Sequence, residues 1–145
     1  MADAKISKTT DSPLLFWTPV ISILLSLLNH TYLLVEHYKI RYGESTGNSL
    51  CNINDLFSCA AVSASKFSEF AGVPVALWGL AANFVLGGLF LTYAWGDEDK
   101  RAGVGRNVLT VAALIALASV VMGTISTFIL SRFCPFCIIA YVLSF

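Results

Sequence analysis

The four cysteines of this chain occur as two pairs in different settings. Cys51 and Cys59 lie eight positions apart in a polar stretch. Cys134 and Cys137 form the sequence CPFC beside an apolar segment. Thiolates exchange disulfides through mixed-disulfide intermediates, and a CxxC that opens a helix holds its two sulfurs within bonding distance. The two pairs therefore predict a relay of thiol–disulfide exchange that delivers electrons to an apolar oxidant dissolved in a membrane.

Two structural interpretations of the cysteines compete with this one. Disulfides that only stabilise the fold would also explain an even number of cysteines, but a bridge within CxxC closes almost no loop and stabilises little. A four-cysteine zinc site is disfavoured because such sites usually combine two short CxxC-like pairs, whereas the first pair here is widely spaced. We expect an enzyme without a bound metal. The alternative is a non-catalytic membrane scaffold or assembly subunit whose outer loops are locked by disulfides.

The composition is that of a membrane protein. Hydrophobic residues make up 57% of the chain and charged residues 12%, and the mean hydropathy is +0.75. Residues 13–35, 73–95 and 108–130 form three apolar runs, each long enough to cross a hydrocarbon core of about 30 Å. The formal net charge of +0 gives no reason to expect a nucleic-acid partner. We predict an integral membrane protein whose spans are surrounded by membrane lipid.

A fourth apolar run continues from Cys134 to the last residue, Phe145. A helix over 134–145 would extend about 18 Å, which is too short to cross the bilayer. Because a carboxylate in mid-bilayer would be costly, we expect that the rest of a fourth span is missing from the sequence. The predicted fold is an all-α, four-helix membrane bundle, with residues 1–145 as one domain and the fourth span truncated.

Both cysteine pairs are predicted to face the same side of the membrane. The outer connection 36–72 carries the first pair, and the short connection 96–107 must lie on the opposite face because one span separates them. The third span then returns the chain, so that CPFC lies on the same face as the first pair. The Lys and Arg residues lean weakly toward a cytoplasmic amino terminus, and cysteines that form disulfides belong outside the cytosol.

The stretch 60–71 precedes the second span and carries apolar residues at the spacing of one helical face. We predict a short amphipathic helix along the membrane surface that ends at Gly72. Cys59 would lie at its start, and Cys134 would lie at the start of another helix if one begins at Pro135. The partial positive charge of a helix amino terminus favours a thiolate at both positions.

The order and spacing of these features resemble the vitamin K epoxide reductase family, including its bacterial disulfide-forming members. The resemblance rests on the loop pair CNINDLFSC, on Ser65 six positions after it, on the Gly-Val-Pro sequence at 72–74, on CPFC after the third span and on Tyr141 four positions after it. It covers nearly the whole chain from the first span onward. The disulfide-bond protein B family also uses two cysteine pairs and a quinone, but its CxxC precedes its loop pair, the reverse of the order here.

The resemblance implies a role for each cysteine. Cys134 and Cys137 would form the redox centre beside a quinone, with Cys137 as the sulfur that engages it. Cys59 would attack the disulfide of this centre at Cys134, and Cys51 would exchange with the thiol partner. The resemblance also implies a bacterial inner membrane, with the active cysteines on the periplasmic side. Bacterial members often carry a thioredoxin-like domain after the last span, and this sequence shows none. The partner would then be a separate thioredoxin-like or DsbA-like periplasmic protein, unless the missing end of the chain contains that domain.

The same resemblance implies which side chains surround the quinone. Ser65 would lie near it, and Tyr141 would line its pocket. Independently of the resemblance, Trp78 lies deeper in the second span than the tryptophans near the span ends, and it is predicted to pack beside the pocket. The vertebrate enzymes carry an asparagine that donates a hydrogen bond to the substrate ring, ahead of a glycine of the second span. Here Val75, ahead of Gly79, takes its place. This difference favours a simple quinone, ubiquinone or menaquinone, over vitamin K epoxide.

Other polar residues in and near the spans are expected to have structural roles. Asn29, His30 and Asn83 are predicted to form interhelical hydrogen bonds or to reach toward the membrane interface. Glu36 and His37 follow the first span and are interpreted as solvated residues.

Overall fold

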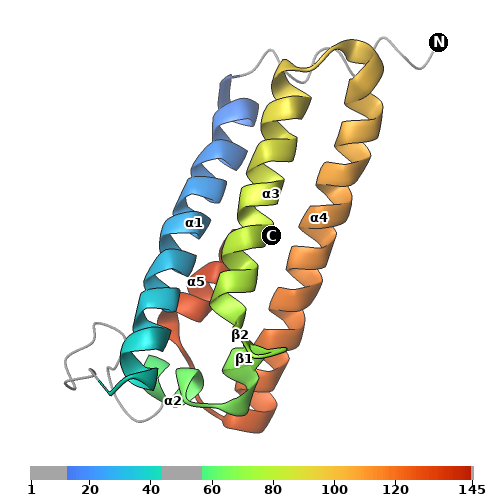
Figure 1. Cartoon of the computed structure of the whole chain (residues 1–145). Coiled ribbons are helices and arrows are strands. Elements are labelled where there is room, and N and C mark those ends of the chain that lie inside the picture. The colour runs from blue at the N-terminus through green and yellow to red at the C-terminus, as the bar shows by residue number, and fades with distance from the viewer. Residues whose placement is uncertain (1–12, 44–56, 145) are drawn as a thin grey trace.

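The computed structural model describes residues 13–43 and 57–144. Three long helices run side by side, and a shorter helix leans against them (Figure 1). The long helices are α1 (Pro13–Arg41), α3 (Val75–Trp95) and α4 (Glu98–Thr124), and α4 continues as the π-helical segment η4 (Ile125–Leu130). The shorter helix is α5 (Pro135–Leu143), which packs against α1 and α4. The all-α membrane architecture predicted from the sequence is confirmed.

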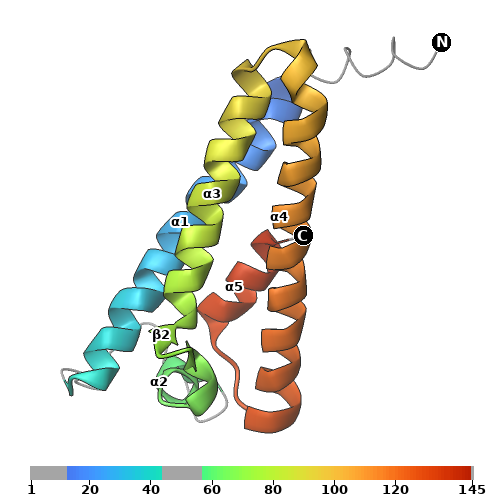
Figure 2. The ribbon, with the colours of Figure 1, turned by 45° about the vertical axis from the view of Figure 1, so that its right-hand side comes forward.

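Several short elements connect α1 to α3. They are α2 (Cys59–Ser63), the 3₁₀ turn η3 (Lys66–Ser68), β1 (Glu69–Phe70) and β2 (Val73–Pro74). The two strands pair antiparallel as a small hairpin. Figure 2 shows α2 and the hairpin at the end of the bundle where η4 ends, and the turn between α3 and α4 at the opposite end. The starts of α2 and α5 therefore share one end of the bundle.

The helices have the surface of a membrane protein. Three of them are long and apolar enough to cross a bilayer: Phe16–Arg41, Val75–Trp95 and Arg101–Leu130. Large apolar side chains such as Leu24 and Phe84 are exposed, whereas the polar side chains of Ser26 and Asn83 are buried. This arrangement suits contact with lipid tails, which are as apolar as the exposed side chains. Each of these helices contains most of one of the three apolar runs recognised in the sequence.

The connection between α3 and α4 is shorter than the sequence indicated. α3 ends at Trp95 and α4 begins at Glu98, so most of the predicted connection 96–107 is helical instead. Gly105 is part of the reason, because a Cβ atom there would lie 3.3 Å from the ring of Tyr93. The small residue lets the two helices approach closely while they continue past the apolar run.

The predicted surface helix over 60–71 is wrong in extent, because α2 ends at Ser63. Serine hydroxyls bond backbone carbonyls in the region where the helix stops. Ser65 Oγ donates to the carbonyl three residues earlier at 2.7 Å, and Ser68 Oγ donates to the carbonyl of Ser63 at 2.7 Å. Gly72, with φ +76°, then adopts the left-handed conformation that turns β1 into β2. The chain therefore forms a short helix, a 3₁₀ turn and a hairpin in place of one helix.

The first helix continues beyond the predicted span end at residue 35 and reaches Arg41. Glu36 and His37 are buried, with 5% and 4% of their surface exposed, so the interpretation of these residues as solvated was wrong. The short helix α2 packs against α1, and Glu69 of the hairpin reaches this last part of α1. Oε1 of Glu69 lies 3.4 Å from His37 Nε2. The polar residues around each position in the sequence do not predict this contact.

The polar residues inside the spans bond in two ways. Asn29 Nδ2 donates to the carbonyl of Phe136 at 2.9 Å, which confirms an interhelical bond and ties α1 to the start of α5. His30 and Asn83 instead bond within their own helices. His30 Nδ1 lies 2.8 Å from the carbonyl four residues earlier, and Asn83 Nδ2 donates to the carbonyl four residues earlier at 2.8 Å.

Candidate functional site

Two cysteines from distant parts of the sequence meet at one end of the bundle. The Sγ atoms of Cys59 and Cys134 lie 2.9 Å apart, and the two residues are 0% and 2% exposed. Leu33, Val62 and Phe136 pack around them. The sulfurs are close enough for thiol–disulfide exchange, and the apolar side chains around them exclude bulk water.

The backbone on either side fixes this contact. Phe57 and Phe133 form an isolated parallel β-bridge, and the N–H of Ser58 donates to the carbonyl of Phe133 at 3.0 Å. The rings of Phe57 and Phe133 also lie 5.9 Å apart. The segments that lead into Cys59 and Cys134 are therefore aligned side by side, which brings the two sulfurs together.

Each of these cysteines lies at the start of a helix, as the sequence predicted. Cys59 is the first residue of α2 and follows the N-cap Ser58, whose Oγ accepts from the N–H of Ala61 at 3.2 Å. Cys134 is the N-cap of α5, where its Sγ accepts from the N–H of Cys137 at 3.2 Å. A sulfur atom thus takes the capping position that a hydroxyl or carboxylate usually occupies.

The surroundings of Cys134 favour its thiolate. The side-chain hydrogen bond from Cys137 is the largest influence and lowers the pKa of Cys134; burial acts in the opposite direction, and the backbone N–H groups of Cys137 and Phe136 lower the pKa further. Cys59 is disulfide-bonded, whereas Cys134 and Cys137 are free. A sulfur that favours the nucleophilic form therefore lies next to a sulfur that can be attacked. Cys51 lies outside the described residues.

A pocket opens beside Cys137 at the same end of the bundle. Ser65, Val75 and Tyr141, which were predicted to surround a quinone, line it together with Cys137. Most of its other walls are apolar and come from Leu33, Val62, Phe67, Ala76, Met122, Ile125, Leu130 and Ala140. A largely apolar pocket with a few polar groups is typical of sites for small organic ligands.

The polar side chains of the pocket are held by contacts within the protein. Ser65 Oγ donates to the carbonyl of Val62 at 2.7 Å, which leaves its lone pairs available to accept a hydrogen bond from a ligand. Tyr141 shares a side-chain hydrogen bond with Ser126. Its ring packs against Gly123, because it lies at an ordinary van der Waals distance, 3.6 Å, from the position that a Cβ atom there would take.

Trp78 does not reach this pocket. Its side chain is 51% exposed, and its Nε1 donates to the carbonyl of Phe70 at 3.3 Å. It lines an adjoining pocket, which it shares with Val75 and Tyr141. The structure therefore places Trp78 beside the predicted group of residues and not in contact with the space next to Cys137.

Sequence reasoning missed His37, which lines the pocket, and Glu69, which contacts it. His30 and Leu33 line the same pocket, so positions 30, 33 and 37 share one face of α1 at helical spacing. This spacing could have indicated that His37 faces the same side of the helix as His30 and Leu33. It was not used because the predicted span ended at residue 35, before His37.

The comparison with protein families agrees with this geometry. The model of the vitamin K epoxide reductase family matches residues 17–145. The chain belongs to this family. Members of the vitamin K epoxide reductase family are oxidoreductases that act with thiol redox proteins and membrane quinones, so the chain is a membrane thiol–disulfide oxidoreductase. No curated protein matches the chain in a sequence search.

Proposed function

We propose that this protein oxidises the dithiol of a separate thioredoxin-like or DsbA-like protein and passes the electrons to a quinone, and so supports disulfide bond formation. The observation that carries the proposal is the 2.9 Å contact between the buried sulfurs of Cys59 and Cys134. A disulfide that only locks a fold needs no free thiol next to it, whereas a relay needs one at each transfer. The free state of Cys134 and Cys137 therefore favours the relay over a disulfide-locked scaffold.

In the proposed relay, the partner dithiol reduces a disulfide between Cys51 and Cys59 and leaves as a disulfide. The thiolate of Cys59 then attacks the inner disulfide at Cys134 and releases the thiolate of Cys137. Cys51 next attacks Cys59 in the mixed disulfide, which restores the outer disulfide and leaves the inner pair reduced. The observed combination of a disulfide-bonded Cys59 with a free inner pair matches the stage after this transfer.

The pocket beside Cys137 suits a quinone as the acceptor. A quinone bound there would take up two electrons and two protons as the inner disulfide forms again. Apolar walls suit its ring and tail, and Ser65 and Tyr141 offer polar atoms at fixed positions. We propose ubiquinone or menaquinone, because Val75 offers no side-chain donor of the kind implied for vitamin K epoxide.

We further propose that the end of the bundle that carries α2 and the start of α5 faces the periplasm of a bacterial inner membrane. Both elements lie at the end opposite the α3–α4 turn (Figure 2). Disulfides persist in oxidising compartments, and the weak bias of basic residues points to the same orientation.

Purified protein in a lipid bilayer tests the proposed activity. With dithiothreitol as the dithiol and decylubiquinone as the acceptor, we expect one quinone to be reduced for each dithiol oxidised. Loss of quinone absorbance and loss of free thiols measure the two halves of the reaction. A variant with every cysteine replaced by serine is the control. If that variant matched the wild-type rate, the scaffold would be the better interpretation.

Val75→Asn is expected to raise the turnover of vitamin K epoxide, which the wild type should reduce poorly. Position 75 lines the pocket together with Cys137 and Tyr141, so an asparagine there can donate to a bound ring. One such hydrogen bond, about 1 to 1.5 kcal/mol, corresponds to roughly tenfold in rate. Epoxide reduction driven by dithiothreitol measures the change. Val75→Leu has a similar shape without a donor and is the control, and an equal gain in that variant would contradict the explanation.

A further inference from the structure

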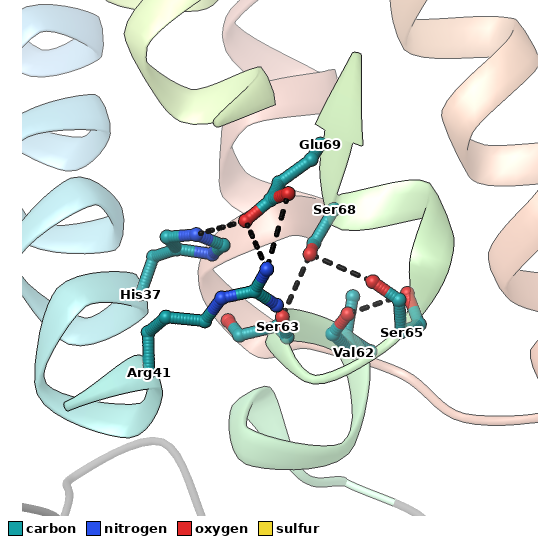
Figure 3. A network of polar contacts seen from close by, with 7 residues as sticks. All are labelled: His37, Arg41, Val62, Ser63, Ser65, Ser68 and Glu69. Carbon is teal, nitrogen blue, oxygen red and sulfur yellow. Dashed lines mark hydrogen bonds and ion pairs between the residues drawn. The ribbon is translucent and has the colours of Figure 1, made fainter. Parts of the chain in front are cut away.

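A network of polar side chains joins the end of α1 to the hairpin, apart from the cysteines (Figure 3). Glu69 of β1 lies against two residues of α1. Its Oε1 is 3.4 Å from His37 Nε2 and 3.3 Å from Arg41 Nη2. Ser68 precedes Glu69, and its hydroxyl bonds the carbonyls of Ser63 and Ser65 at 2.7 and 2.8 Å. These bonds hold the start of β1 in place beside α1.

His37 connects this network to the pocket of the relay. Its side chain is 5% exposed and lines the pocket together with Cys137 and Tyr141. The side chain of Glu69 is 27% exposed and that of Arg41 is 57% exposed. A path of ionisable side chains therefore leads from solvent through Glu69 and His37 to the space beside Cys137.

The proposed reaction needs a proton that the inner cysteines do not supply. Reduction of a quinone to a quinol consumes two electrons and two protons. Two thiols would release both protons as they form a disulfide. A thiolate at Cys134, which the hydrogen bond from Cys137 favours by lowering the pKa of Cys134, has already lost one of them. One proton per turnover must then enter the pocket from another group.

We propose that His37 donates this proton to the quinone, and that Glu69 passes a proton from solvent back to His37. The inference rests on the proposed function, since it assigns a role within the same reaction. In the balanced step, the Cys134 thiolate, the Cys137 thiol, the quinone and protonated His37 give the inner disulfide, the quinol and neutral His37. The inner pair is oxidised by two electrons, and the quinol gains one proton from Cys137 and one from His37.

Other ionisable groups lie close to His37. Cys137, Tyr141 and His30 line the same pocket, and Glu36 is buried at the preceding position of α1. His37 is set apart by its contact with a carboxylate that solvent reaches. An imidazole ring can both donate and accept a proton, which suits a group that passes protons from one partner to another. His37 is therefore the group best placed both to give a proton and to regain it.

The test compares the wild type with His37→Gln in a lipid bilayer, after the inner cysteines have been reduced with dithiothreitol. We expect the variant to reduce decylubiquinone roughly 100-fold more slowly at neutral pH, the scale of general acid catalysis. Its dissociation constant for decylubiquinone, measured by quenching of tryptophan fluorescence, should stay near the wild-type value. The ratio of wild-type to variant rates should fall as the pH rises, because a general acid acts only in its protonated form. Imidazole should restore part of the rate of His37→Ala.

Lys39→Gln is the matched control, because Lys39 is exposed on the same part of α1 and its loss also removes a positive charge. It should keep the wild-type rate.

A rate ratio that is constant with pH, together with no rescue by imidazole, would overturn the inference and leave His37 as a structural link to β1. If the His37 variants do not fold, Glu69→Gln tests the inference in their place. The rate of quinone reduction by this variant should fall more at high pH than at low pH. A loss of rate that does not depend on pH would overturn the inference. A wild-type protein that reduced no decylubiquinone would instead contradict the proposed function.

Discussion

Cys134→Ser is expected to stop the transfer of electrons to the quinone, with a loss of roughly 1,000-fold or more, the scale that follows removal of a nucleophile. Cys134 is the sulfur that contacts Cys59 at 2.9 Å, and a serine hydroxyl cannot form the mixed disulfide. Serine is also a favourable N-cap, so α5 should still begin at Pro135 and the fold should be kept. The rate of decylubiquinone reduction by dithiothreitol measures the loss.

The outer pair supplies the internal control for this variant. Dithiothreitol should still reduce the proposed disulfide between Cys51 and Cys59 at the wild-type rate, as alkylation and mass spectrometry would show. Loss of both reactions would indicate a damaged fold. A variant that kept a large part of the quinone-linked activity would show that Cys134 does not receive electrons from the outer pair.

The spans and the reactive helix start could be predicted because local sequence determines them. An uninterrupted apolar run commits the backbone to a helix in lipid, whatever packs against it. Cys134 became the N-cap of α5 because Pro135 suits the first helical turn, where its missing N–H costs nothing. Ser65 and Tyr141 were placed in the pocket by resemblance to the family, and the structure brings both of them to the pocket beside Cys137.

The roles of His37 and Glu69 could not be predicted, because the burial of one depends on the position of the other. Each is a polar residue in a segment with other charges, which is the pattern of a solvated surface. The hairpin brings them together across 32 positions of sequence. Gly72 allows the turn of that hairpin, but the residues around it in the sequence do not indicate which helix the hairpin will contact.

The pocket that Trp78 lines could not be predicted either, because it depends on the direction in which the side chain leaves the helix axis. Trp78 lies three residues after Val75, so the two side chains point about 60° apart on an α-helix. That difference is enough to leave Val75 in the pocket beside Cys137 and to move Trp78 to the adjoining pocket. The tryptophan then finds its hydrogen-bond acceptor in the hairpin, at the carbonyl of Phe70.

Cys137→Ser should accumulate a disulfide between Cys59 and Cys134. The thiolate of Cys134 would attack Cys59 in its existing disulfide and, in the proposed pairing, release the thiolate of Cys51. In the wild type, the mixed disulfide can be resolved at Cys59 by Cys51 or at Cys134 by Cys137, and the variant lacks the second route. The backbone N–H of residue 137, which donates to Cys134 Sγ at 3.2 Å, is retained, so the attacking thiolate keeps part of its stabilisation.

Peptide mapping without reduction identifies the bridge. Cleavage before Asp55 separates Cys51 from Cys59, and trypsin cleaves after Arg132, so each possible pairing has its own mass. We expect the Cys59–Cys134 bridge as the main species, and its absence when Cys59→Ser is added as the control. The pairing follows from position, because Cys59 supplies the sulfur that lies 2.9 Å from Cys134 in a closed apolar surround. A bridge formed mainly between Cys51 and Cys134 would contradict this pairing and would reverse the assigned order of the outer pair.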